Sequence, residues 1–186
     1  TDAVRITGGN NPNINPPLAN DTFTNSAGAA VELGFFVPQV TWAFSGLQAS
    51  GNGCDCIELD GGTVTQGDTW RIAQDPGLPL AFPNGITVQN GGTLTVQGLT
   101  QPLELAANTS VNVQGGGTLN MTGSAATPIL VTGIGQTPAC WGRINIQGGG
   151  SLSYVHLSHG GCGTNVNSAV EIDNSSPTLS NVTIDH

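Results

Sequence analysis

The sequence predicts an all-β protein, a parallel β-helix in which short strands stack coil upon coil. Three observations support this prediction. A motif of about ten residues recurs along the chain, a Gly-rich corner occupies the same place in most copies, and apolar residues alternate with polar ones. Self-similarity at a period of roughly 20–50 residues is typical of solenoid proteins.

Each copy of the motif has a polar residue between two apolar ones, then a corner, then Thr or Ser before an apolar residue. The copies lie at residues 57–64, 86–94, 111–119, 144–152 and 170–179. Their first residues are 29, 25, 33 and 26 positions apart, which suits coils whose loops vary in length. Within a copy, alternation places Ile144 and Ile146 on one face of a strand and Asn145 and Gln147 on the other.

The corners and the remaining strands complete the predicted coil. Glycine suits a corner because it accepts a positive φ without a steric penalty. A third strand per coil is expected at residues 103–105 and 128–131, and the segment 152–157 matches 179–184 in pattern. A β-sandwich is the competing arrangement, but its hairpins do not require one corner to recur so often. We therefore expect residues 51–186 to form the coils.

Residues 1–50 have a different character. The segment 10–17 is rich in Asn and Pro, which no central strand tolerates. Residues 29–37 are apolar enough to cover the open end of a solenoid, and we expect residues 1–50 to form an N-terminal extension and cap. The alternative is that a leading strand pairs with a neighbouring molecule, and that strand comprises Ala3, Val4, Arg5, Ile6 and Thr7.

Composition excludes several classes of function. The chain has 12 carboxylate side chains, three Arg and no Lys, for a net charge of −9. Binding to nucleic acid or to anionic lipid needs clustered cations that this chain lacks. No apolar run approaches the roughly 20 residues of a membrane-spanning helix. The chain begins at Thr1 without a charged leader, so we expect that any secretion signal has been removed.

Four segments together resemble the bacterial right-handed β-helix surface proteins. They are the strand and corner at 86–96, the Pro-Ile strand at 125–129, the Trp-Gly-Arg-Ile run at 141–144 and the coil strand at 152–157. The resemblance covers roughly residues 55–186. It implies a right-handed helix, and related coils occur in adhesins, in filament and surface-layer proteins, and in polysaccharide lyases and hydrolases.

The four cysteines suggest disulfides. Cys140 and Cys162 each precede the leading strand of successive coils, so stacked loops bring them within reach of each other and we expect them to pair. Cys54 and Cys56 then bond to each other or find other partners. One Cys-x-Cys pair without further ligands at suitable spacing is weak evidence for zinc. Disulfides favour a secreted protein, extracellular or at the cell surface.

The enzymatic alternative depends on three residues. Glu171 and Asp173 point outward from one strand, and Arg143 lies about one coil away. The resemblance implies the chemistry here, because β-helix lyases bind calcium through outward carboxylates and use a nearby Arg or Lys as base. The simpler interpretation is an ion pair between Arg143 and Glu171. A glycosidase, which needs only two suitably separated acids, is a further alternative.

The expected function is structural. We expect a secreted, non-catalytic protein without a cofactor that serves as a filament subunit assembling head to tail, or as part of an adhesin stalk. The last strand, with Val182 and Ile184, leaves an end of the solenoid open to such assembly. The expected partner is a second copy, with surface polysaccharide as another candidate. Candidate glycosylation sites are Asn20, Asn108, Asn120, Asn174 and Asn181.

Overall fold

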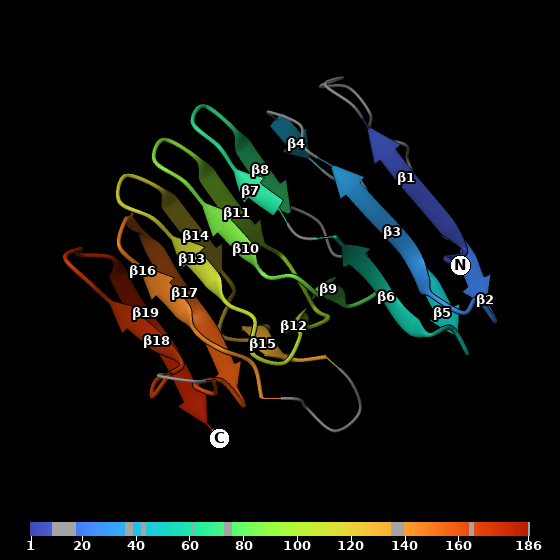
Figure 1. The fold of residues 1–186 in the computed structure, drawn as a ribbon. Coiled ribbons are helices and arrows are strands. Elements are labelled where there is room, and N and C mark those ends of the chain that lie inside the picture. Colours follow the sequence, from blue (N-terminus) through green and yellow to red (C-terminus); the bar gives the residue numbers. More distant parts are fainter. Residues whose placement is uncertain are drawn as a thin grey trace.

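The computed structural model is an all-β parallel solenoid of about six turns, which confirms the predicted fold class (Figure 1). It describes residues 1–8, 18–35, 39–41, 44–60, 62–72, 76–134, 140–163 and 166–185. Within these residues it has 19 strands and no helix. The strands form sheets of twelve, five and two members.

The twelve-stranded sheet contains two rows of strands. Its first row follows the axis from the N-terminal end and consists of β1 (Val4–Gly8), β3 (Ala29–Phe35), β6 (Cys54–Leu59), β9 (Leu80–Phe82), β12 (Leu103–Leu105) and β15 (Ile129–Gly133). Its second row consists of β4 (Gln39–Thr41), β8 (Thr69–Ile72), β11 (Thr93–Gln97) and β14 (Thr118–Thr122). The long strand β17 (Gly149–Ser158) joins the two rows, because its first half pairs with β14 and its second half with β15. β19 (Thr178–Asp185) then pairs along β17.

The five-stranded sheet contains the recurring motif. Its members are β7 (Gly62–Val64), β10 (Ile86–Val88), β13 (Val111–Val113), β16 (Ile144–Ile146) and β18 (Val170–Ile172). In the copy at 144–152 the expected corner is displaced: Gly149 and Gly150 belong to β17, and Leu152 pairs with Met121 instead of Leu119. The leading strands of the last four copies are aligned as the sequence predicts. The first copy is not: Ile86 pairs with Gly62, whereas Ile57 lies in the other sheet and pairs with Leu80. The chain has two consecutive strands here, β6 and β7, that both end in an alternating pattern. The pattern alone does not tell which of them aligns with β10.

A continuous ladder of apolar side chains runs the length of the molecule. We call it the axial ladder, and its members are Val4, Val31, Ile57, Leu80, Leu103, Val131, Leu157 and Ile184, each aligned with the next in parallel register. Its six inner members belong to one buried core cluster. Because side chains alternate between the faces of a strand, the residue after each member points outward.

Three strands of the N-terminal segment, β1, β3 and β4, belong to the twelve-stranded sheet. β3 pairs with β1 along one edge and with β6 along the other. β2 (Thr22–Thr24) and β5 (Gln48–Ser50) form the two-stranded sheet. The N-terminal segment thus continues the parallel stacking, and β1 and β19 lie at opposite ends of the molecule (Figure 1).

Candidate functional site

The last coil exposes side chains that occupy core positions in the coil before it. The exposed fractions are 44% for Ile172, 43% for Leu179 and 49% for Ile184. Their aligned partners in the preceding coil, Ile146, Leu152 and Leu157, are at most 1% exposed. These are the large exposed hydrophobic side chains of the described residues. The last coil that the structure describes therefore presents an open core on its outer side.

The backbone of the last coil is also open on one side. β18 pairs only with β16 and β19 only with β17 among the described strands. The other edge of each strand therefore presents N–H and C=O groups in the geometry that a further parallel strand would meet. Val182 is partly buried against the core. Among the described strands it has one aligned neighbour, Val155 of β17.

The opposite end of the molecule is formed by β1. Val4 and Ile6 are half-buried and align with Val31 and Leu33 of β3. The outward Arg5 forms an ion pair with Glu32, with 3.0 Å between Nη2 and Oε1. The N–H of Ala3 donates to the carbonyl of Ala29. The side chain of Thr7 lies outside the described residues.

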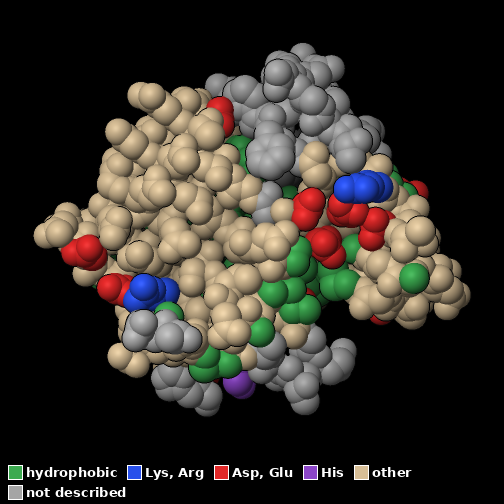
Figure 2. Space-filling view, viewed as in Figure 1, with side chains coloured by type: hydrophobic (Ala, Val, Ile, Leu, Met, Phe, Trp, Pro, Cys, Tyr) green, Lys and Arg blue, Asp and Glu red, His purple; other side chains and the backbone are tan. Residues whose placement is uncertain are grey.

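Acidic side chains gather around a basic one at the β1 end of the molecule (Figure 2), where Arg5 pairs with Glu32. A hydrogen bond between the carboxyl groups of Asp2 and Glu32 lowers the pKa of Asp2 and raises that of Glu32. The N–H of Ala29 also donates to Asp2, at 3.1 Å, which favours the charged form of Asp2. Burial raises the pKa of Glu58, which is aligned with Glu32 on the next strand. Glu32 is therefore protonated before Asp2 when the pH falls.

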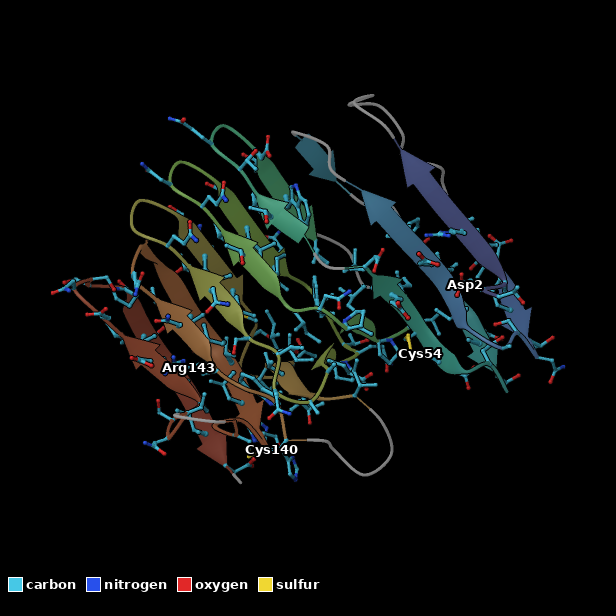
Figure 3. All side chains as sticks on the ribbon, in the orientation of Figure 1. Asp2, Cys54, Cys140 and Arg143 are labelled. Atoms are coloured by element: carbon cyan, nitrogen blue, oxygen red, sulfur yellow. A yellow bond between two sulfur atoms is a disulfide. The ribbon has the colours of Figure 1, made fainter. Side chains whose placement is uncertain are left out.

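Arg143 and Glu171 form an ion pair between successive coils. Arg143 precedes β16, where its N–H donates to Ser110, and Glu171 lies in β18. Asp173 follows β18 and accepts a hydrogen bond of 3.3 Å from Gln147. In the lyase interpretation Arg143 would be the base. Its guanidinium is instead paired with the carboxylate of Glu171. Figure 3 shows Arg143 toward the β18 end of the molecule, far from Asp2 at the β1 end.

Both disulfides are present in the structure. Cys140 bonds to Cys162, and the two Cα atoms are 5.6 Å apart. Cys54 bonds to Cys56 at the start of β6, which answers the question that the sequence left open. Cys56 packs with Ala29 and Ala81 in a small apolar cluster separate from the main core.

Three of the five candidate glycosylation sites, Asn20, Asn108 and Asn174, lie at bends or turns, and Asn181 lies within β19. Asn20, Asn108, Asn174 and Asn181 have φ values of 58°, 61°, 49° and 53°. Asn adopts this left-handed conformation more readily than most residues, so these side chains have a conformational reason to be Asn. Asn120 lies in β14 instead, and its Oδ1 accepts a hydrogen bond of 3.2 Å from Ser151.

Two grooves were not apparent from the sequence. A groove of about 570 Å³ crosses the five-stranded sheet, and its lining includes Asp60, Asn84, Thr87, Asn108 and Asn112. The amide of Asn84 donates to the backbone and side-chain oxygens of Asp60, both at 3.2 Å. A smaller groove of about 320 Å³ lies beside the Cys54–Cys56 disulfide. Sequence reasoning missed both because each draws its residues from several coils.

In the described part of the chain, no three His, Cys, Asp or Glu side chains are placed to hold a metal ion. The same residues contain no helix of the length and apolarity needed to cross a membrane. No family model, curated protein or solved structure matches the chain.

Proposed function

We propose that this protein is an extracellular structural subunit that assembles end to end into a filament. One observation carries the proposal: the last coil exposes Ile172, Leu179 and Ile184 at positions where the preceding coil is buried. A coil that added to this end would bury these side chains and complete the hydrogen bonds of β18 and β19.

The two ends of the solenoid differ, and this determines the kind of assembly. β19 closes the first row of the long sheet at one end, and β1 begins it at the other. Contact between two unlike ends is heterologous, and such a contact forms an open chain unless a rotation closes it. Because all of these strands are parallel, the next copy would continue the stack in the same direction.

Two further features support an extracellular location and a structural role. The Cys54–Cys56 and Cys140–Cys162 disulfides are favoured in oxidising surroundings. The sequence also resembles the bacterial right-handed β-helix surface proteins, and related coils occur in filament proteins and adhesins. Surface stalks and filaments are rigid structures built from repeated contacts, and a solenoid in which each coil contacts its neighbours suits that role.

The test is the association state of the purified full-length chain. Light scattering and negative-stain microscopy would be recorded over a range of concentrations for the native chain and for Ile184→Asp. The matched control is Thr183→Asp, because Thr183 is exposed and points outward from the same strand. We expect fibres from the native chain and from the control, and none from Ile184→Asp. A native chain that stays monomeric at every concentration would refute the proposal.

A further inference from the structure

Apolar burial alone does not explain how two ends would recognise each other. Full burial of one large aliphatic side chain contributes about 1.5–3 kcal/mol, and the three side chains of the last coil are already about half buried. Their burial would contribute about 2–4 kcal/mol in total. Association of two proteins costs an estimated 4 kcal/mol or more in lost freedom of motion. Backbone pairing and polar contacts must supply the difference and select the register.

A second ladder runs beside the axial ladder on the outer face. We call it the outer ladder. Its residues are aligned from Arg5 through Glu32, Glu58, Ala81 and Glu104 to Thr132, and Ser158 and Asp185, which are aligned with each other, follow Leu157 and Ile184 of the axial ladder. Each follows a member of the axial ladder by one residue. The outer ladder therefore begins with a cation at the β1 end and finishes with an anion at the β19 end.

We propose that in the end-to-end assembly Val4 of one copy takes the next place in the axial ladder, beside Ile184 of its neighbour, and so brings Arg5 next to Asp185. This inference rests on the proposed function and specifies the register of the contact. The start of β1 in one copy, Val4 and Arg5, would lie parallel to the end of β19, Ile184 and Asp185, in the other. Neighbouring strands are about 4.8 Å apart, so the two outward side chains would lie within reach of an ion pair.

Both charged groups are available for this contact. The side chain of Arg5 is 60% exposed, and that of Asp185 is 51% exposed. Arg5 has five N–H donors, and its contact with Glu32 leaves others free. Asp185 accepts a hydrogen bond of 2.6 Å from His156, which lowers the pKa of Asp185 and keeps it ionised. The assembled order of side chains would be His156, Asp185, Arg5 and Glu32, in which Asp185 and Glu32 flank the cation.

Other registers do not give this match. A shift of one residue would turn Arg5 into the core, because successive side chains of a strand face opposite sides. A shift of two residues places Ile6 beside Ile184, which keeps apolar side chains inside but sets Arg5 beside Thr183 and leaves Asp185 without a cation. A shift of two residues in the other direction would place Arg5 two positions past Asp185, so the two charges would not meet. Pairing of Val4 with Ile184 satisfies both ladders.

The first test reverses the charges. Asp185→Arg and Arg5→Glu are each expected to raise the concentration needed for assembly roughly tenfold or more, because an attraction becomes a repulsion. A chain carrying both substitutions should assemble near the native concentration. Asp173→Arg is the control, since it reverses an exposed charge at the same end but outside the outer ladder. Circular dichroism below the assembly concentration checks that each variant is folded.

The second test reads the register directly. Arg5→Cys and Asp185→Cys chains are mixed under mild oxidation, beside a mixture of Arg5→Cys with Thr183→Cys. Paired positions fall within the Cα separation of about 4.4–6.8 Å that a disulfide needs, whereas positions offset by two residues do not. We expect covalent dimers in the first mixture only.

The outcomes separate the two proposals. If the native chain does not assemble, the proposed function fails and the register fails with it. If the native chain assembles but charge reversal has no effect, or Asp173→Arg has the same effect as Asp185→Arg, the filament stands and the Arg5–Asp185 contact is wrong. Cross-links between positions 5 and 183 would also overturn the proposed register.

Discussion

Leu179 lies beside Leu152 in parallel register, yet Leu152 is fully buried and Leu179 is 43% exposed. Leu152 also has Met121 as its partner on the other side, whereas Leu179 has a partner on one side only among the described strands. The two residues occupy the same place in the repeat. Their energetic contributions differ because one lies inside the stack and the other at its end.

The first prediction compares truncation of these two side chains. Leu152→Ala should lower the free energy of unfolding by about 3–5 kcal/mol, because it removes buried methyl groups and leaves a cavity. Leu179→Ala should cost less than about 1 kcal/mol in the monomer. Urea denaturation below the assembly concentration measures both values. Equal losses would mean that the end of the solenoid is covered in solution.

A second prediction concerns the disulfides. In the chain-entropy model, a bond that closes a loop of 22 residues stabilises the folded state by about 3 kcal/mol, and one between residues two apart by only about 1 kcal/mol. Replacement of Cys140 and Cys162 by Ser should therefore destabilise the protein more than the same change at Cys54 and Cys56. Thermal unfolding of both double variants provides the comparison, and the reverse order would contradict it.

A third prediction follows from the raised pKa of Glu104. Burial raises this pKa, so the folded state binds the proton more readily than the unfolded state. The contribution of Glu104 to stability therefore falls as the pH rises from the unfolded pKa of about 4.3 through the higher folded pKa. Glu104→Gln should raise the melting temperature at pH 7, and the gain should shrink below about pH 4.

The control for this prediction is Glu171→Gln. Glu171 forms an ion pair with Arg143, so neutralising it should lower stability by less than about 1 kcal/mol instead of raising it. The melting temperatures of both variants would be measured across the same pH series. A fall in melting temperature for Glu104→Gln at pH 7 would show that its carboxylate has a stabilising partner.

A fourth prediction concerns the corner at Asn108. Its φ of 61° is unfavourable for most residues and costs a β-branched side chain about 1–2 kcal/mol. Asn108→Val should therefore destabilise the protein by about that amount, whereas Asn108→Gly and Asn108→Asp should be nearly neutral. Chemical denaturation of the three variants tests this order. A variant made to remove this glycosylation sequon should use Asp or Gly, so that loss of a glycan is not confused with strain.

Much of the fold could be predicted from the sequence because the repeat encodes it locally. Alternation at residues 86–88, 111–113 and 144–146 reports which side chains face inward, and the corners report where each strand ends. The alignment of residues 152–157 with 179–184 was predicted in the same way and is confirmed by the register of β17 and β19. Each of these inferences needs only a few consecutive residues.

What could not be predicted depends on long-range register. The stacking of Glu32 on Glu58 joins residues 26 positions apart, and a shift in register between Ala29 and Val31 lies just before it. The degree of exposure at Ile184 was also not apparent from the pattern, because residues 179–184 match the buried residues 152–157. A pattern records which face of a strand is apolar, and it does not record whether another coil follows.

The Cys140–Cys162 disulfide also determines how the protein would respond to a pulling force. If the two ends of the chain were drawn apart, each coil that peeled from the stack would release its residues as extended chain. The disulfide withholds the 22-residue interval between its cysteines, which corresponds to roughly 75 Å of extended length. An oxidised molecule would therefore stop extending sooner than a reduced one. In a fibre under load, this bond would limit how far a damaged subunit could stretch before the strain passed to its neighbours.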